Sequence, residues 1–406
     1  MVTRITNTML TNTLLSNLSM NLGRMDKLQS QLSSGRKFGH ISDDPSALIY
    51  GQAARNKLAR LSHYQGTVET AQSWLTQAEA GVMELNKVIG AVYEELVSAG
   101  SVKTDEDKKN VAMVVKQLQD HYVDTLNSSY GDRFVFSGYN TPGDWARDMD
   151  PEVKPFTIVV ENVGGRNIPQ LHFNGFNISQ FNGMPAALMN MDLVNDPDPT
   201  TTLDTFFSGL MEADGVTQKY PGGLADFATE FGFASPADAV DTLVMKQQLM
   251  GDVISLDVGP GISMPITQNG IDIVFFISYS EDGSPIMRNT FDLLQEVYIG
   301  INGCPDDPSI RPLETEELTK LIAEVQGAQN HLLTRTAEIG GRQRRLELLE
   351  ARYAQDNLNY EKMRSDAEDA DMAEVIMYLK MAETVYQAAL SAGARVIQPT
   401  LMDFLR

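Results

Sequence analysis

The chain of 406 residues is poor in the residues that build disulfide frameworks and metal centres. Its one cysteine, Cys304, excludes an intrachain disulfide and a thiolate cluster, and we interpret it as an inert small hydrophobic residue. No apolar run approaches the roughly 18 residues that a membrane-spanning helix needs. The N-terminus lacks the continuous apolar stretch and small-residue cleavage site of a secretory signal peptide, so export would need another route.

Basic residues are also scarce, with 32 lysines and arginines against 54 acidic residues and a net charge of −22. Residues 141–312 hold 24 acidic and 7 basic residues, a net charge of −17, which leaves about −5 for the two ends together. Such a charge repels nucleic-acid phosphates and anionic lipid, so we expect neither nucleic acid nor membrane as a partner. The asymmetry predicts a solvent-facing middle and contact-making ends.

Motifs that carry chemistry are missing as well. Gly259-Pro-Gly261 has no following lysine or third glycine to hold a phosphate, so we interpret it as a turn. Asp196 and Asp198 alternate with prolines and indicate an acidic turn rather than a calcium loop. The five histidines are scattered, and no two of them stand at the spacing of metal ligands. They are His40, His63, His121, His172 and His331. We therefore predict no enzyme activity, no metal and no cofactor.

Helical periodicity dominates the first part of the chain. Residues 8–33 predict an amphipathic helix that ends at Gly35, and Asp43, Asp44 and Pro45 predict the start of the next. That next helix is long, because apolar residues recur every seven positions without a break, which indicates a coiled-coil seam. They are Ala47, Ala54, Leu61, Val68, Leu75, Val82, Ile89 and Leu96. Gly100 ends this helix, and Thr104 with Asp107 predicts a capping box for a third.

The period changes after Phe134-Val-Phe136, which is strand-like. From about 140 to 290, turn residues separate short β-branched and aromatic runs, which predicts a β-rich region. The expected strands are Phe156–Val160, Leu171–Phe173 and Ile271–Tyr279. Residues 185–255 interrupt them with helix-like pieces near 203–212 and 236–250.

The seven-residue recurrence returns from 313 onward. Its apolar positions are Leu318, Val325, Leu332, Ile339, Leu346, Tyr353 and Tyr360. A charged break at 364–371 precedes a last helix with Val375, Ala382, Ala389 and Val396. A long helix gains its stability from the face that it buries, so we expect the two ends to fold against each other.

The predicted fold class is mainly α with an inserted β-rich region. The N- and C-terminal segments form a long antiparallel coiled-coil-like bundle, from which a central α+β domain projects. The expected parts are 1–45 as an assembly helix and loop, 46–140 as coiled-coil helices, 141–290 as the central domain with the 185–255 insertion, 291–365 as a coiled-coil helix and 366–406 as a second assembly helix.

Two sets of residues are predicted to make the contacts. The intramolecular seam consists of Leu61, Val68, Leu75, Val82, Ile89, Val325, Leu332, Ile339, Leu346 and Tyr353. The terminal segments carry large apolar side chains that a single copy would leave exposed, which generally marks an interaction surface. The predicted self-assembly contacts are Leu15, Leu18, Leu22, Met25, Leu32, Val375, Leu379, Tyr386, Val396 and Leu401.

Motifs at both ends resemble the bacterial flagellin superfamily. They are Arg4-Ile-Thr-Asn-Thr, Leu28-Gln-Ser-Gln-Leu-Ser-Ser-Gly-Arg-Lys37 and Ser42-Asp-Asp-Pro-Ser-Ala47 near the start, and Asp366-Ala-Glu-Asp-Ala-Asp-Met-Ala-Glu374 and Tyr386-Gln-Ala-Ala-Leu390 near the end. The resemblance covers about residues 1–140 and 313–406. The N-terminal and C-terminal motifs occur in the same order as in that superfamily.

Within that superfamily the chain is more similar to hook–filament junction proteins than to flagellins. The features are Pro45 after the two aspartates, Arg133-Phe-Val-Phe-Ser-Gly-Tyr-Asn-Thr-Pro142, and the Leu401-Met-Asp-Phe-Leu405 ending. Arg406 and a longer 185–255 depart from the pattern. The resemblance implies unfolded type III export, an export chaperone at the C-terminal region, and a ring of copies between the hook-side junction protein and flagellin, in the bacterial flagellum outside the cell.

Two alternatives stay open at the level of sequence. The first is a flagellin filament subunit of the same superfamily, which would polymerise by itself. The second is a secreted enzyme or binding module carried by residues 141–312, which would need a pocket with converging polar groups.

Overall fold

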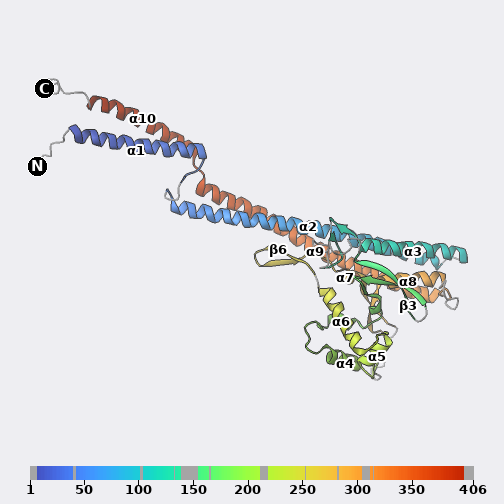
Figure 1. Ribbon diagram of the computed structural model, residues 1–406. Coiled ribbons are helices and arrows are strands. Elements are labelled where there is room, and N and C mark those ends of the chain that lie inside the picture. Colours follow the sequence, from blue (N-terminus) through green and yellow to red (C-terminus); the bar gives the residue numbers. More distant parts are fainter. Residues whose placement is uncertain are drawn as a thin grey trace, which may run out of the picture. The chain divides into compact units, whose positions relative to one another are not determined.

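Long helices occupy both ends of the chain, and short strands occupy its middle (Figure 1). The computed structural model describes residues 7–39, 43–100, 104–131, 133–138, 154–163, 166–210, 218–251, 253–280, 283–303, 311–313 and 315–396. These residues form two units, one from 1–65 with 350–406 and the other from 66–349. The predicted class, mainly α with an inserted β-containing region, is confirmed.

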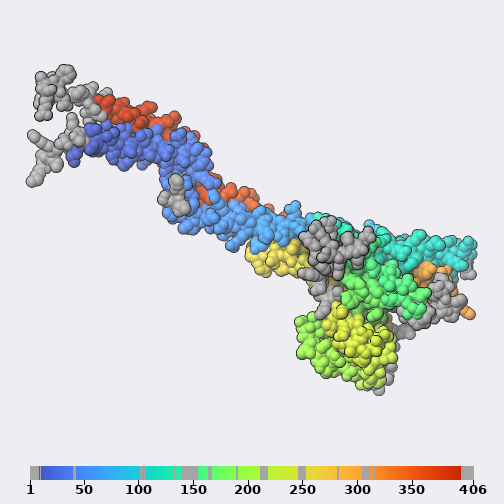
Figure 2. Space-filling view, viewed as in Figure 1, coloured from blue at the N-terminus to red at the C-terminus, as the bar shows by residue number. Residues whose placement is uncertain are grey.

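The first unit pairs helices from opposite ends of the sequence. Helix α1 (Asn7–Ser34) lies antiparallel to α10 (Met372–Val396), and the two are in contact along their length in Figures 1 and 2. Gly35 follows α1 with φ 70°, the left-handed conformation that glycine adopts without strain at a helix C-terminus. The Ala47 backbone N–H donates to Asp44 Oδ1 at 3.0 Å, so of the two candidate aspartates, Asp43 and Asp44, it is Asp44 that caps the next helix.

That next helix, α2 (Pro45–Ala99), runs antiparallel to α9 (Thr315–Glu368). In the first unit, Tyr64 stacks on Tyr353 with ring centroids 6.3 Å apart. In the second unit, Gln326 donates to the Tyr93 hydroxyl at 3.3 Å. The predicted seam residues are all buried, namely Leu61, Val68, Leu75, Val82, Ile89, Val325, Leu332, Ile339, Leu346 and Tyr353. Burial of apolar residues at every seventh position supports both helices along the seam.

Helix α3 (Asp105–Leu126) packs against α8 (Thr290–Asn302) in the second unit. Thr104 caps α3 as predicted, because its hydroxyl oxygen accepts the Asp107 backbone N–H at 3.3 Å. The buried Gln119 amide donates to the carbonyl of Phe291 at 3.2 Å and ties the two helices by a polar bond as well.

The strands of the second unit form small antiparallel sheets. They are β1 (Ser129–Tyr130), β2 (Arg133–Phe134), β3 (Phe156–Val163), β4 (Arg166–Phe173), β5 (Phe176–Asn177), β6 (Ser255–Gly259), β7 (Ile262–Pro265), β8 (Phe275–Tyr279) and β9 (Pro285–Asn289). The β3-β4-β5 sheet has three strands, and the pairs β1-β2, β6-β7 and β8-β9 have two each. The turn predicted at Gly259-Pro-Gly261 joins β6 to β7.

One predicted strand is partly wrong. Only Phe275–Tyr279 of the expected strand Ile271–Tyr279 is extended, because residues 270–274 form the short helix α7 (Gly270–Val274). Asn269 caps α7 by accepting the Ile271 backbone N–H at 3.0 Å. A short apolar run fits a buried helix as well as a strand, so periodicity does not distinguish them.

Residues 185–255 contain a small helical cluster. Its helices are α4 (Pro199–Gly209), α5 (Leu224–Glu230) and α6 (Pro236–Gly251), preceded by the short 3₁₀ helices η2 (Ser179–Phe181) and η3 (Ala186–Asn190). Phe207 and Phe227 stack at its centre with centroids 3.9 Å apart. Asp198, from the predicted acidic turn, caps α4 by accepting the Thr201 backbone N–H at 3.2 Å.

Candidate assembly surface on the terminal helices

An apolar cluster holds α1 and α10 together within one copy. Its buried members are Leu28, Val375 and Ala382, and its partly buried members are Met25, Leu32, Ala370 and Leu379. The Asn21 side-chain amide adds a bond to the carbonyl of Ala382 at 3.3 Å. Four predicted self-assembly residues, Met25, Leu32, Val375 and Leu379, therefore already contribute to the packing of a single chain.

Backbone bonds join the loop after α1 to the break between α9 and α10. The Ala370 N–H donates to the Gly35 carbonyl at 2.9 Å, and the Lys37 N–H donates to the Glu368 carbonyl at 2.7 Å. The buried Glu368 carboxylate accepts from the guanidinium of Arg55 on α2. The predicted break at 364–371 is thus shorter than expected, since α9 continues to Glu368. These bonds hold the loop after α1 and the break before α10 together, next to the parts of α2 and α9 that belong to this unit.

Gly51 leaves room for the Glu368 side chain. A methyl group at Gly51 would lie 2.5 Å from Oε1 and 2.8 Å from Cγ of Glu368, so the carboxylate would have to leave Arg55. We expect Gly51→Ala to lower the free energy of unfolding of this unit by about 1–2 kcal/mol, after its gain in helix propensity. Chemical denaturation followed by circular dichroism measures this. Gly66→Ala on the same helix is the control, because nothing lies within 4 Å of its added methyl; equal stabilisation by both substitutions would contradict the expectation.

The outer faces of the pair are unusually apolar. Leu15 and Leu22 of α1 are exposed, with 47% of Leu22 accessible. Helix α10 exposes apolar side chains on both sides of its buried row; they are Met372, Ile376, Met377, Tyr378, Met381, Val385 and Leu390. A helix that is apolar on most sides is typical of one that is covered on most sides. Among the described residues, α1 covers one side of α10, so the exposed apolar side chains on the other sides are a candidate interaction surface.

A groove of about 430 Å³ lies along one side of the α1–α10 pair. Leu28 and Ala382, both buried, contribute to its lining. The other lining residues are Asn21, Arg24, Lys27, Gln31, Tyr378, Met381 and Val385. The groove combines an apolar wall from α10 with a cationic rim from α1, so it suits an apolar segment that also carries carboxylates.

The other predicted assembly residues differ in their positions. Leu15 and Leu22 face outward, and Leu18 and Tyr386 are half-buried. The side chain of Val396 and the whole of Leu401 lie outside the described residues. Spacing identified the apolar residues but did not distinguish those that bind the chain's own partner helix from those that stay open. To separate the two groups of residues, one must know how α1 and α10 are aligned along each other. The residues Tyr378, Met381 and Val385 were missed, although their 3- and 4-residue spacing is a readable signal.

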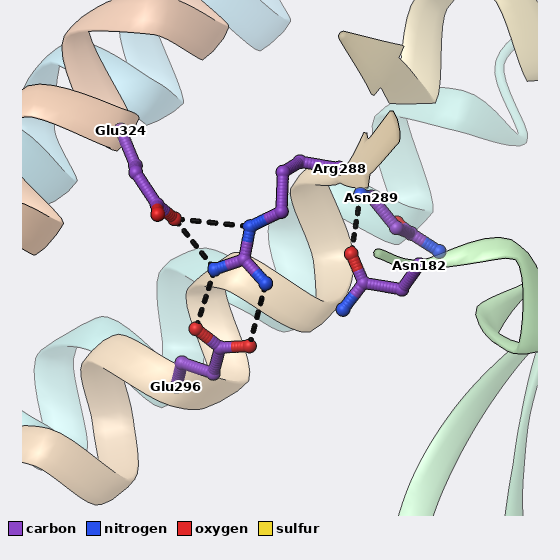
Figure 3. Close-up of polar contacts among 5 residues, drawn as sticks. All are labelled: Asn182, Arg288, Asn289, Glu296 and Glu324. Atoms are coloured by element: carbon purple, nitrogen blue, oxygen red, sulfur yellow. Dashed lines mark hydrogen bonds and ion pairs between the residues drawn. The ribbon is translucent and has the colours of Figure 1, made fainter. Parts of the chain in front are cut away.

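A polar cluster in the second unit was also missed by sequence reasoning (Figure 3). Arg288 of β9, whose side chain is only 12% exposed, makes two bonds to the Glu296 carboxylate of α8, at 3.0 and 2.6 Å. Its guanidinium also donates to Glu324 of α9, at 3.0 and 2.5 Å. Beside it, the Asn289 backbone N–H donates to Asn182 Oδ1 at 3.0 Å. Arg288 therefore links the β8–β9 hairpin and α8 to the long helix α9.

Asp292, in the first turn of α8, is a buried carboxyl group near this cluster. The pKa of Asp292 is raised to about 7, mainly because the group is buried. The hydrogen bond from the Ser179 hydroxyl and the charge of Arg288 lower this pKa, whereas the charge of Glu296 raises it. Its Oδ2 atom has no hydrogen-bond partner among the described residues. Ionised Asp292 is therefore unfavourable in the folded chain.

This pKa predicts a pH dependence of stability. Between about pH 4 and 7 the folded chain keeps the proton of Asp292 and the unfolded chain has lost it, so unfolding releases a proton. The contribution of Asp292 to the free energy of unfolding should fall by about 1.4 kcal/mol per pH unit as pH rises through this window. Asp292→Asn should remove that slope and stabilise the protein at pH 8. Urea denaturation at pH 5, 6, 7 and 8 measures it; identical slopes in both proteins would refute it.

The described residues contain neither a cluster of metal-binding side chains nor a helix that could cross a membrane. No group of three His, Cys, Asp or Glu side chains among them is placed to hold a metal ion. None of the described helices combines the length and apolar character needed to cross a membrane.

Paired helices from the two ends of the chain, with exposed apolar side chains, define a coiled-coil-type helical architecture. Residues 5–141 match the family described as the bacterial flagellin N-terminal helical region. The N-terminal third of the chain is therefore a flagellin-type helical region, which confirms the resemblance for that part. The predicted resemblance of residues 313–406 lies outside this match and stays a prediction.

Individual relatives are also flagellar. Flagellar hook-associated protein 3 of Salmonella typhimurium is 26% identical over 140 residues, which cover 34% of this chain and 44% of the relative. The flagellar filament 30.7 kDa core protein of Treponema maltophilum is 28% identical over 113 residues, 28% of this chain and 39% of the relative. The matches thus span less than half of each curated relative. The solved flagellar junction protein FlgL of Legionella pneumophila aligns with 80% of this chain and 100% of its own, at 12% identity and a TM-score of 0.46.

Proposed function

We propose that this chain is a structural component of the bacterial flagellum that joins the hook-side junction protein to the flagellin filament. The observation that carries the proposal is the packed α1–α10 pair, which leaves large apolar side chains exposed on its outer faces. Such faces are incomplete until other chains cover them. The similarity to flagellar hook-associated protein 3 over 140 residues supports assembly at the junction of hook and filament.

The proposal includes the partners and the route. Copies of the chain form a ring, which contacts the hook-side junction protein on one side and flagellin on the other. The chain leaves the cell through the flagellar type III apparatus, and an export chaperone binds its C-terminal region. It acts mechanically and not as an enzyme. The acidic region 141–312 faces outward, which fits its net charge of −17.

Deletion of the gene tests this role. The deletion strain should keep its hooks, lose its filaments and release flagellin monomer into the medium, because flagellin is then exported without a surface on which to assemble. Electron microscopy of cells and immunoblots of the medium measure the three outcomes. Filaments of normal number in the deletion strain would rule the role out, and a plasmid copy of the gene should restore filaments in the strain that lacks it.

A filament subunit is the second candidate, because a flagellar filament core protein is among the relatives. The two roles share the N-terminal helical region, so that region does not separate them. They differ in self-assembly. A filament subunit polymerises into long fibres when it is purified and seeded, whereas a junction protein stays monomeric or forms short rings. Sedimentation of the purified chain with and without seeds distinguishes them.

A further inference from the structure

The α1–α10 pair presents two different flanks. Each helix of the pair turns one row of residues toward its partner. Because the helix repeats every 3.6 residues, the exposed residues of each helix fall on one side or the other of that buried row. The groove flank carries Arg24, Lys27, Gln31, Tyr378, Met381 and Val385, which line one groove. The same repeat places Leu15, Leu22, Ile376, Glu383 and Leu390 on the opposite side, the ridge flank.

The groove flank exposes both apolar and cationic side chains. Met381 is 55% exposed on its wall. Arg24 has no hydrogen bond or ion pair with any of the described residues, whereas Lys27 already pairs with Asp43 at 3.0 Å. An occupant that fits therefore supplies large apolar side chains and a carboxylate near Arg24.

The ridge flank has the opposite chemistry. Leu22 and Ile376 are each 47% exposed, so the ridge offers apolar side chains of the size that the groove takes. Glu383 places a carboxylate beside them, and its one ion partner among the described residues is the neighbouring, exposed Lys380 on its own helix, at 2.9 Å. An exposed pair of this kind contributes little, so Glu383 is free to exchange it for a better one.

We infer that the ridge flank of one copy seats in the groove flank of the next, with Glu383 paired to the neighbour's Arg24. This rests on the proposed function and specifies the contact between copies within it. A contact between two different faces on opposite sides of one molecule is heterologous. Each copy then still offers one free face, so the contact repeats from copy to copy until a ring closes.

Charge reversal tests the pairing. Arg24→Glu and Glu383→Arg, each introduced alone into the chromosomal gene, should reduce filaments per cell at least tenfold, since each puts two like charges together at the contact. The double variant restores opposite charges and should return filament number to within twofold of wild type. Arg345→Glu, an exposed charge on α9 outside the terminal pair, is the control and should keep wild-type numbers. Circular dichroism of the purified chains checks that all four fold alike.

The outcomes separate this inference from the proposed function. Normal filament numbers in both single variants, or a double variant as defective as either single one, would overturn the pairing of Arg24 with Glu383. A defect in Arg24→Glu without one in Glu383→Arg would also overturn it, and would mean that the groove takes another protein. The proposed function fails independently, if the wild-type gene does not restore filaments to a strain that lacks it.

Discussion

Leu15→Asp combined with Leu22→Asp should give a folded, exported chain that no longer supports filaments. Both side chains face outward from the α1–α10 pair, so in one copy the aspartates stay in water. In the assembled ring they would be buried without a partner, which costs several kcal/mol for each carboxylate and is repeated in every copy. Counts of filaments on cells and of hook-bound chain in isolated hooks measure the effect.

Two comparisons make this result specific. Asn12→Asp with Ser16→Asp adds the same charge to exposed polar positions of α1 and should keep filaments. Met25→Asp should instead lower the helicity of the isolated chain, because Met25 packs on the cluster of Leu28, Val375 and Ala382. Filaments retained by the Leu15 and Leu22 variant would show that this face is not an assembly contact.

Arg288→Met should lower the free energy of unfolding by about 2–3 kcal/mol. The substitution leaves Glu296 and Glu324 facing each other without the cation that each of them contacts at 3.0 Å or less. Removal of one member of a buried ionic cluster typically costs 3–5 kcal/mol, and the partial exposure of the two glutamates reduces that figure. Urea denaturation of the purified chain measures the change.

Matched variants separate the buried cluster from surface charge in general. Arg344→Met removes an arginine with a 2.7 Å pair to Glu347, but this pair is exposed and should contribute less than about 0.5 kcal/mol. Glu296→Gln and Glu324→Gln, added to Arg288→Met, should recover most of the loss, because no unpaired charge then remains. Equal effects of Arg288→Met and Arg344→Met would contradict the account of the cluster.

The helical ends could be predicted because their signal is periodic. Seven-residue recurrence identified the buried residues of α2 and α9, such as Leu75 and Leu332, without knowledge of any neighbour. Capping residues predicted helix starts for the same reason, since Thr104 and Asp44 act on N–H groups three residues away. Local chemistry and fixed spacing were sufficient there.

The remaining features depend on neighbours that are distant in sequence. Arg288 bonds to Glu296, 8 residues away, and to Glu324, 36 residues away, and no repeat connects the three. The groove of α1 and α10 needs the register of two helices about 360 residues apart, as the bond of Asn21 to Ala382 illustrates. Ile271–Val274 was assigned to the wrong element because a short apolar run has no period of its own.

In the proposed function, the terminal helices of this chain assemble with other copies at the boundary between hook and filament. Immunogold electron microscopy of intact flagella, with antibody against the acidic middle region, tests it most directly. The account predicts a single narrow band of label where the filament begins, and none along its length. Label spread along the whole filament would identify a filament subunit instead, and flagella without any label at that boundary would contradict the account.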